Sequence, residues 1–72
     1  MITKEIAVSL KPGATLIHVS ELNADKTPVR CRINGKCQTW KTRPADFKLP
    51  VKYGLRTCFY ITPFNAHLWE VA

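Results

Sequence analysis

The chain has 72 residues, of which 46% are hydrophobic, and its 11 Lys and Arg residues outnumber its 5 Asp and Glu residues to give a net charge of +6. This length predicts a single domain, residues 1–72, with a small core. No apolar run reaches the roughly 18 residues of a membrane-spanning helix, and residues 1–10 lack the apolar segment of a signal peptide, so we expect a soluble cytoplasmic protein.

The first part of the chain predicts a β-hairpin. Apolar and polar residues alternate over residues 2–10, which is typical of a half-buried strand, and residues 15–22 are rich in β-branched side chains. The Pro-Gly pair between these segments predicts a turn. With a two-residue loop, Lys4 would face Glu21 across the hairpin, whereas a longer loop would shift this register.

After a polar connection, Asn34-Gly35 is the clearest turn signal in the chain. Both residues tolerate the positive φ angles of a type I′ turn, so residues 29–33 and 36–40 are predicted to pair as a second hairpin. In this register Val29, Cys31, Ile33 and Trp40 face the core, and the opposite face is basic.

Residues 42–53 are not expected to form a central strand, because Pro44 and Pro50 cannot donate to a β-ladder. One interpretation is a helical turn at residues 45–47. The other is an extended segment along an edge of the sheet, with its alternating apolar residues packed inward. Those residues are Phe47, Leu49 and Val51.

The last part of the chain predicts a strand over residues 56–62, with Phe59 and Ile61 on one face. Thr62-Pro63 favours a helical turn at residues 63–66, and a short strand is expected at 67–71. The fold class is therefore mainly β. We expect a small twisted antiparallel sheet or a partly open barrel of the SH3 or OB type, with about five strands and at most one short helical turn.

Positive charge is concentrated in residues 28–56, where eight bases and one acid give +7, while three bases and four acids elsewhere give −1. In the predicted hairpin, one phase carries Arg30, Arg32, Lys41 and Arg43. The patch would extend to Lys36, Lys48, Lys52 and Arg56. Such a patch attracts phosphates or acidic protein surfaces, but a solvated basic surface that only aids solubility has the same pattern.

Aromatic residues among these bases suggest base stacking as a second possibility. Trp40 is more simply explained as a residue of the core or its edge, because it faces Val29 in the predicted register. Tyr53 and Tyr60 are better stacking candidates, since we place both out of phase with their apolar neighbours.

No residue pattern favours catalysis or metal binding. The acids are scattered, and nothing brings His18 or His67 next to a cysteine. The three cysteines lack the short spacings of structural zinc sites, and we expect reduced thiols, with Cys31 as a small core residue. The sequence therefore predicts a protein that is not an enzyme and that uses no metal or other cofactor.

Four short motifs follow one another in the second part of the chain: NGK at 34–36, TWKTRP at 39–44, LPVKYGL at 49–55 and YIT at 60–62. Together they resemble a pattern in small phage, prophage and bacterial proteins of no established activity. The resemblance spans roughly residues 30–68 and leaves out residues 1–28. It implies a phage accessory protein, and such proteins often bind a host or defence component.

We expect a small basic binding module that attaches to nucleic acid mainly through the phosphates, as a monomer or a homodimer. The alternative is a phage effector that binds and inhibits a host protein or defence complex, in the manner of an anti-CRISPR protein. The predicted binding residues are the same in both cases: Arg30, Arg32, Lys36, Lys41, Arg43, Lys48, Lys52, Tyr53 and Arg56.

Overall fold

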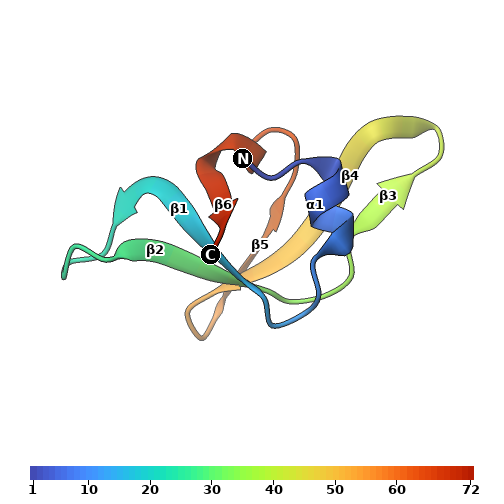
Figure 1. Ribbon diagram of the computed structural model, residues 1–72. Coiled ribbons are helices and arrows are strands. Elements are labelled where there is room, and N and C mark those ends of the chain that lie inside the picture. The colour runs from blue at the N-terminus through green and yellow to red at the C-terminus, as the bar shows by residue number, and fades with distance from the viewer.

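Six strands and two short helical segments make up the computed structural model, which describes residues 1–72 (Figure 1). The elements are α1 (Lys4–Ser9), β1 (Thr15–Leu22), β2 (Pro28–Ile33), β3 (Gln38–Trp40), β4 (Arg43–Tyr53), β5 (Thr57–Ile61), the 3₁₀ helix η1 (Ala66–Leu68) and β6 (Trp69–Val71). The mainly-β prediction is confirmed, with six strands in a sheet that does not close into a barrel. Neither helical segment has the length and apolar character needed to span a membrane.

Strand β4 is the centre of the sheet because both of its edges are paired. Along one edge lies β5, with Leu49 opposite Ile61. Along the other edge β2 and β3 follow one another, with Val51 paired to β2 and Phe47 paired to β3. Strand β2 pairs next with β1, and β1 with β6, and every one of these pairs is antiparallel.

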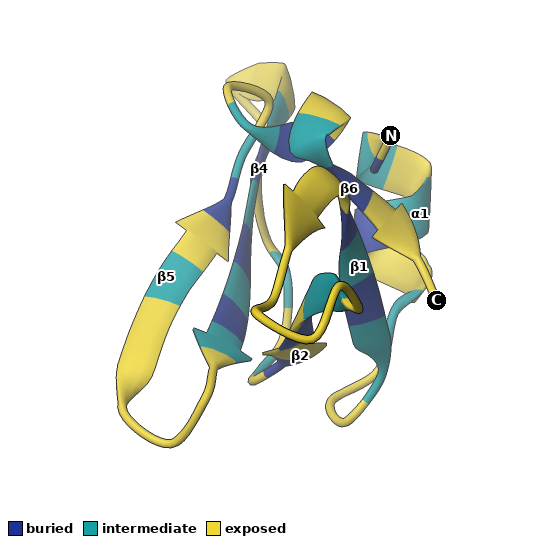
Figure 2. Cartoon of the chain, turned by 90° about the vertical axis from the view of Figure 1, so that its left-hand side faces the viewer, coloured by how far each residue is buried: buried dark blue, intermediate teal, exposed yellow.

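The core lies on the inner side of this curled sheet. Phe47, Leu49 and Val51 are at most 4% exposed, which confirms that these residues of β4 point inward. In Figure 2 buried bands also mark β1 and the start of β6, whereas most of β5 is exposed. The predicted helical turn at residues 45–47 is wrong, and so is the expectation that this segment is not a central strand.

A central position for β4 is compatible with Pro50 because the ladder is already interrupted there. The Asn34 amide donates to the Pro50 carbonyl at 2.9 Å, just where β2 ends. Ile33 and Gln38 are five residues apart, whereas their partners on β4, Val51 and Lys48, are only three residues apart. The two extra residues form a bulge between β2 and β3. The missing N–H of Pro50 therefore falls at a gap in the ladder.

The hairpin predicted at Asn34-Gly35 is wrong, because β2 and β3 do not pair with each other. Gly35 does not have a positive φ angle, so no type I′ turn forms. Its small size suits a different contact, since a Cβ atom there would lie 3.1 Å from Pro50 Cγ. Gly35 thus lets the connection between β2 and β3 lie close to Pro50 of β4.

The strand predicted over residues 2–10 is also wrong, because α1 occupies most of this segment. Thr3 caps the helix by accepting a hydrogen bond from the Ile6 amide at 3.2 Å. Ile2, Ile6 and Leu10 pack in or against the core, while Val8 is 56% exposed. The four-residue spacing of these three residues fits a helix, although they also fit the two-residue spacing of a strand.

The turn predicted at Pro12-Gly13 is present, and Gly13 has a φ angle of +94°. It joins α1 to β1 instead of joining two strands, so the predicted first hairpin does not exist. The Gly13 amide donates to the Ile33 carbonyl at 2.9 Å, which ties this turn to the end of β2. The actual partner of β1 in a hairpin is β2.

Strand β1 has a bulge where it faces β2. Ile17 and Leu22 are five residues apart, but their partners on β2, Arg30 and Pro28, are only two residues apart. Backbone amides inside such a bulge lose their ladder partners. Two of them, from Ser20 and Glu21, instead donate to His18 Nδ1 at 3.1 and 2.9 Å. Since His18 is only 9% exposed, its ring supplies an acceptor that water would otherwise have to provide.

The strand prediction for residues 15–22 is confirmed without change, and that for residues 56–62 is confirmed by β5. The chain ends much as expected, with a helical turn followed by a strand. The turn lies about three residues later than predicted, as the 3₁₀ helix at Ala66–Leu68, and β6 is correspondingly short.

Replacing His18 by Phe keeps a ring of similar shape but removes the acceptor for two amides. We expect the His18→Phe variant to lose about 1–2 kcal/mol of unfolding free energy, measured by urea denaturation. His67→Phe is the matched control, because His67 is exposed in η1 and should change stability by less than about 0.5 kcal/mol. Equal stability of the two variants would show that the bulge does not depend on His18.

The Gly35 contact with Pro50 can be tested with a double-mutant cycle. Gly35→Ala places a methyl group against the Pro50 ring, so we expect it to destabilise the protein by about 1 kcal/mol. In a Pro50→Ala background the same substitution should be milder by at least about 0.5 kcal/mol, because the ring is gone. Strictly additive effects on the free energy of unfolding would contradict this account of Gly35.

Candidate nucleic-acid interface

Strands β2 and β4 gather four cationic side chains on the outer face of the sheet, which is turned away from the core. Arg32 lies opposite Lys52 in the β2–β4 pair, so their side chains share a face. Arg30 and Lys48 lie an even number of residues away on the same strands and keep the same phase. We call Arg30, Arg32, Lys48 and Lys52 the basic face.

Three of these four cations line an open hollow of about 670 Å³. Arg30, Arg32 and Lys52 contribute positive charge, and Thr15 and Asn34 add a hydroxyl and an amide. No carboxylate lines the hollow. A concave surface with several cations and no acid concentrates positive potential, which favours a phosphate or another anion.

The cations of the hollow are free of internal ion pairs. The two ion pairs of the structure join the N-terminus to Glu70 at 3.9 Å and Arg43 to Asp46 at 3.7 Å. By strand register, the acid nearest to Arg30 is Glu70, which lies two strands away, across β1. Glu70 pairs with the N-terminus and not with Arg30. The positive charge around the hollow is therefore available to a ligand.

Tyr60 extends the basic face onto β5. It lies opposite Pro50 in the β4–β5 pair, and the Lys48 ammonium lies 4.1 Å from the centre of its ring. The Tyr60 side chain remains 48% exposed. An exposed aromatic ring beside cations can stack on a nucleobase while the cations contact phosphates.

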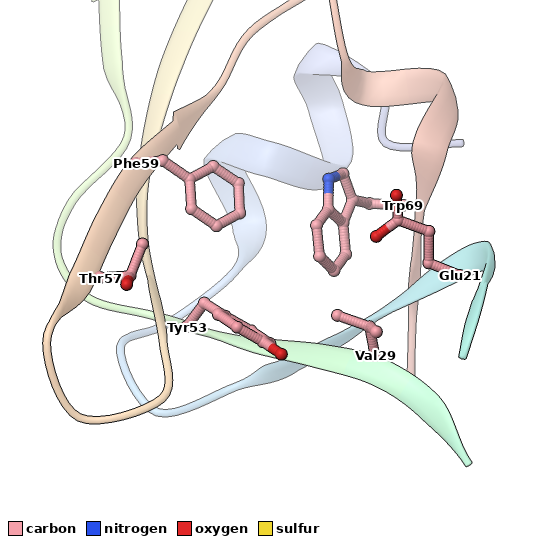
Figure 3. Close-up of a pocket in the computed structure, with 6 residues that line it drawn as sticks. All are labelled: Glu21, Val29, Tyr53, Thr57, Phe59 and Trp69. Carbon is pink, nitrogen blue, oxygen red and sulfur yellow. The ribbon is translucent and has the colours of Figure 1, made fainter. Parts of the chain in front are cut away.

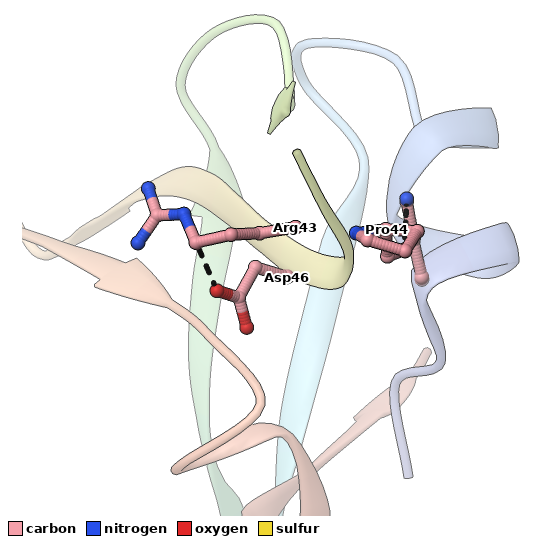
Figure 4. A network of polar contacts seen from close by, with 4 residues as sticks. Arg43, Pro44 and Asp46 are labelled. Carbon is pink, nitrogen blue, oxygen red and sulfur yellow. Dashed lines mark hydrogen bonds and ion pairs between the residues drawn. The ribbon is translucent and has the colours of Figure 1, made fainter. Parts of the chain in front are cut away.

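The structure does not bring Lys41 and Arg43 to this face. Lys41 lies in the tight turn between β3 and β4, and Arg43 lies nine residues along β4 from Lys52. The Arg43 guanidinium stacks 4.5 Å from the centre of the Trp40 ring. It also pairs with Asp46, as Figure 4 shows. The expectation that Arg30, Arg32, Lys41 and Arg43 share one face is wrong, because it depended on the Asn34-Gly35 hairpin.

Trp40 itself is half-buried beneath Arg43 and lies outside the buried core cluster. It pairs with Arg43 and not with Val29. Nearby, the Lys4 ammonium donates to the Pro44 carbonyl, so the predicted pairing of Lys4 with Glu21 is wrong.

The other predicted binding residues are scattered. Lys36 lies in the connection between β2 and β3, and Arg56 lies in the turn between β4 and β5. Both are exposed, but neither lines the hollow. Thr15 and Asn34 were not predicted, since only the tertiary structure places them beside the cations.

Tyr53 points to the inner side of the sheet and not to the basic face. It continues the phase of Phe47, Leu49 and Val51, so the expectation that it is out of phase with them was wrong. Together with Phe59, Trp69 and Val29 it lines a second pocket of about 240 Å³ (Figure 3). The aromatic character of this pocket was not predicted, because its rings come from three different strands.

All three cysteines are free thiols, and Cys31 is a buried core residue as predicted. Burial raises the pKa of the Cys31 thiol to about 11, and it also raises the pKa of the Cys37 thiol. No three His, Cys, Asp or Glu side chains cluster in a way that could hold a metal ion.

Comparison of the chain with protein-family models, with curated proteins and with solved structures found no match. The resemblance to small phage and bacterial proteins therefore stays a prediction. The basic face and the hollow that it forms are the features of this protein that bear most directly on function.

The raised pKa of Cys31 predicts a loss of stability at high pH. The unfolded chain releases this proton near the ordinary pKa of 9.0 and the folded chain near 11, so the stabilisation is complete below pH 9 and is lost as the pH rises to 11. We expect a contribution of about 2 kcal/mol over this window, measured by urea denaturation.

The Cys31→Ala variant should show a correspondingly shallower decline of unfolding free energy with pH, whatever its starting stability. Cys58→Ala is the control, since Cys58 is exposed and the pH profile of this variant should match that of the wild type. Parallel profiles for wild type and Cys31→Ala would rule out the buried thiol as the cause.

Proposed function

We propose that the basic face of this protein binds the phosphate backbone of a nucleic acid. The observation that carries the proposal is the hollow in which Arg30, Arg32 and Lys52 converge without an acid. These three cations come from two strands that are paired to each other, so their spacing is held by the sheet. No enzymatic step is part of the proposal.

The side chains of the basic face are better suited to phosphate contacts than to recognition of base sequence. Arg and Lys side chains on a sheet surface reach phosphate oxygens, and such contacts hold a strand in place without reading its sequence. Arg30 and Arg32 add planar guanidinium groups that can contact phosphate through two parallel hydrogen bonds. We therefore expect weak discrimination among sequences and strong dependence on salt.

Tyr60 favours a single strand over a duplex as the ligand. Its exposed ring lies on the same face as the cations, and a base can stack on such a ring only when it is free of its partner strand. A single strand crossing from β2 to β5 would meet the arginines first and Tyr60 after Lys48. The proposed ligand is thus single-stranded DNA or RNA.

Fluorescence anisotropy with labelled oligonucleotides tests the proposal. Three phosphate contacts on a single strand predict a slope of about −2 when the logarithm of the binding constant is plotted against that of salt concentration. Arg32→Glu should weaken binding at least about tenfold at low salt and make this slope shallower by about 1.

Lys41→Glu is the matched control for Arg32→Glu, since it causes the same change of net charge at the far end of β4. It should weaken binding no more than about twofold, because distant exposed charges are screened by salt. The absence of binding at about 50 mM salt, or equal losses in the two variants, would overturn the proposal. A protein partner that is captured from nuclease-treated host lysate and lost with Arg32→Glu would instead assign the face to an acidic protein surface.

A further inference from the structure

The aromatic pocket on the inner side of the sheet is separate from the basic face. Tyr53 comes from the end of β4, Phe59 from β5 and Trp69 from β6, and Glu21 from β1 completes one side (Figure 3). Strands β5 and β6 do not pair with each other, so the pocket lies where the curled sheet stays open. Its volume of about 240 Å³ leaves space for a small group.

The pocket has a rigid floor and a more accessible wall. Trp69 is only 6% exposed, and its ring is held by His18 at a centroid distance of 5.0 Å and by Phe59 at 5.7 Å. Tyr53, at 41% exposure, forms the accessible wall. Aromatic faces carry negative electrostatic potential, so rings arranged around one space attract a cation.

Glu21 adds a formal negative charge to this aromatic surface. Its carboxylate takes part in neither ion pair of the structure, and its backbone amide is held by His18 in the bulge of β1. No Lys or Arg side chain lines the pocket, and the cation–π pairs within the chain use Trp40 and Tyr60 instead. The site combines aromatic faces and a carboxylate that are free to act on a ligand.

We propose that the pocket formed by Tyr53, Phe59, Trp69 and Glu21 binds an alkylammonium group. Such a group combines an apolar surface, which suits the rings and Val29, with a delocalised positive charge, which suits Glu21. The same chemistry occurs in small quaternary ammonium cations such as choline and in methylated lysine side chains. This binding is independent of the proposed nucleic-acid binding, because the two sites lie on opposite faces of the sheet.

Nuclear magnetic resonance titration with choline chloride tests the proposal, with sodium chloride replaced at constant ionic strength. Choline should shift the Trp69 indole N–H resonance and leave the Trp40 indole unchanged. The neutral isostere 3,3-dimethylbutan-1-ol should bind at least about tenfold more weakly, since it keeps the shape of choline and lacks its charge.

Two variants probe the site, and both residues are exposed enough for the fold to persist. Glu21→Gln and Tyr53→Ala should each weaken choline binding about five- to tenfold. Glu70→Gln is the control, because Glu70 is an exposed carboxylate in register with the outer-face positions, and its affinity should stay within about twofold of the wild type.

Equal binding of choline and its neutral isostere would overturn the proposal, and so would unchanged affinity in Glu21→Gln. Binding of uridine at Trp69 without binding of choline would also overturn it and would assign the pocket to a nucleobase. A peptide with trimethyllysine among uncharged residues identifies the source of the ligand. Tighter binding of this peptide than of choline supports a protein side chain, and the reverse supports a small free cation.

Discussion

Burial of the inner face of β4 organises the whole sheet. Phe47, Leu49 and Val51 are almost fully buried, and burying each such side chain stabilises the fold by about 1.5–3 kcal/mol. At the same time both edges of β4 are paired, so the strand determines where β2, β3 and β5 lie. The connection between β2 and β3 can lie close to β4 because Gly35 has no Cβ atom. Pro50 is tolerated there because the ladder needs no N–H donor at its position.

The two candidate sites are consequences of the same sheet. Alternation along β2 and β4 sends apolar side chains inward and cations outward, which produces the basic face directly behind the core. The sheet curls but β5 and β6 do not pair with each other, and the rings of Phe59 and Trp69 meet across the opening between them. The bulge of β1, held by His18, brings Glu21 to the same opening. One face thus carries positive charge, while the other carries rings and a carboxylate.

Much of the fold could be predicted from local patterns, and the errors have identifiable causes. Strands β1 and β5 and the inward residues of β4 follow from β-branched content and alternation. The N-terminal helix was missed because its apolar residues fit both a two-residue and a four-residue spacing. Asn34-Gly35 was misassigned because a glycine close to a neighbouring proline ring has the same sequence signature as a glycine in a turn. For the candidate site, Arg30 and Arg32 were placed together correctly, whereas Lys41 and Arg43 depended on the wrong hairpin.

Local patterns in the chain are enough to predict the mainly-β class, the concentration of positive charge between residues 28 and 56, and the alternation that separates cations from core residues along each strand. These are local properties, set by composition and by the two-residue repeat of a strand. The folded arrangement of the strands was needed to show that Arg32 lies beside Lys52, that Tyr53 faces inward with Trp69, and that Thr15 and Asn34 line the hollow. Strand pairing and register decide these neighbours, and both are selected by which residues the whole chain can bury at once.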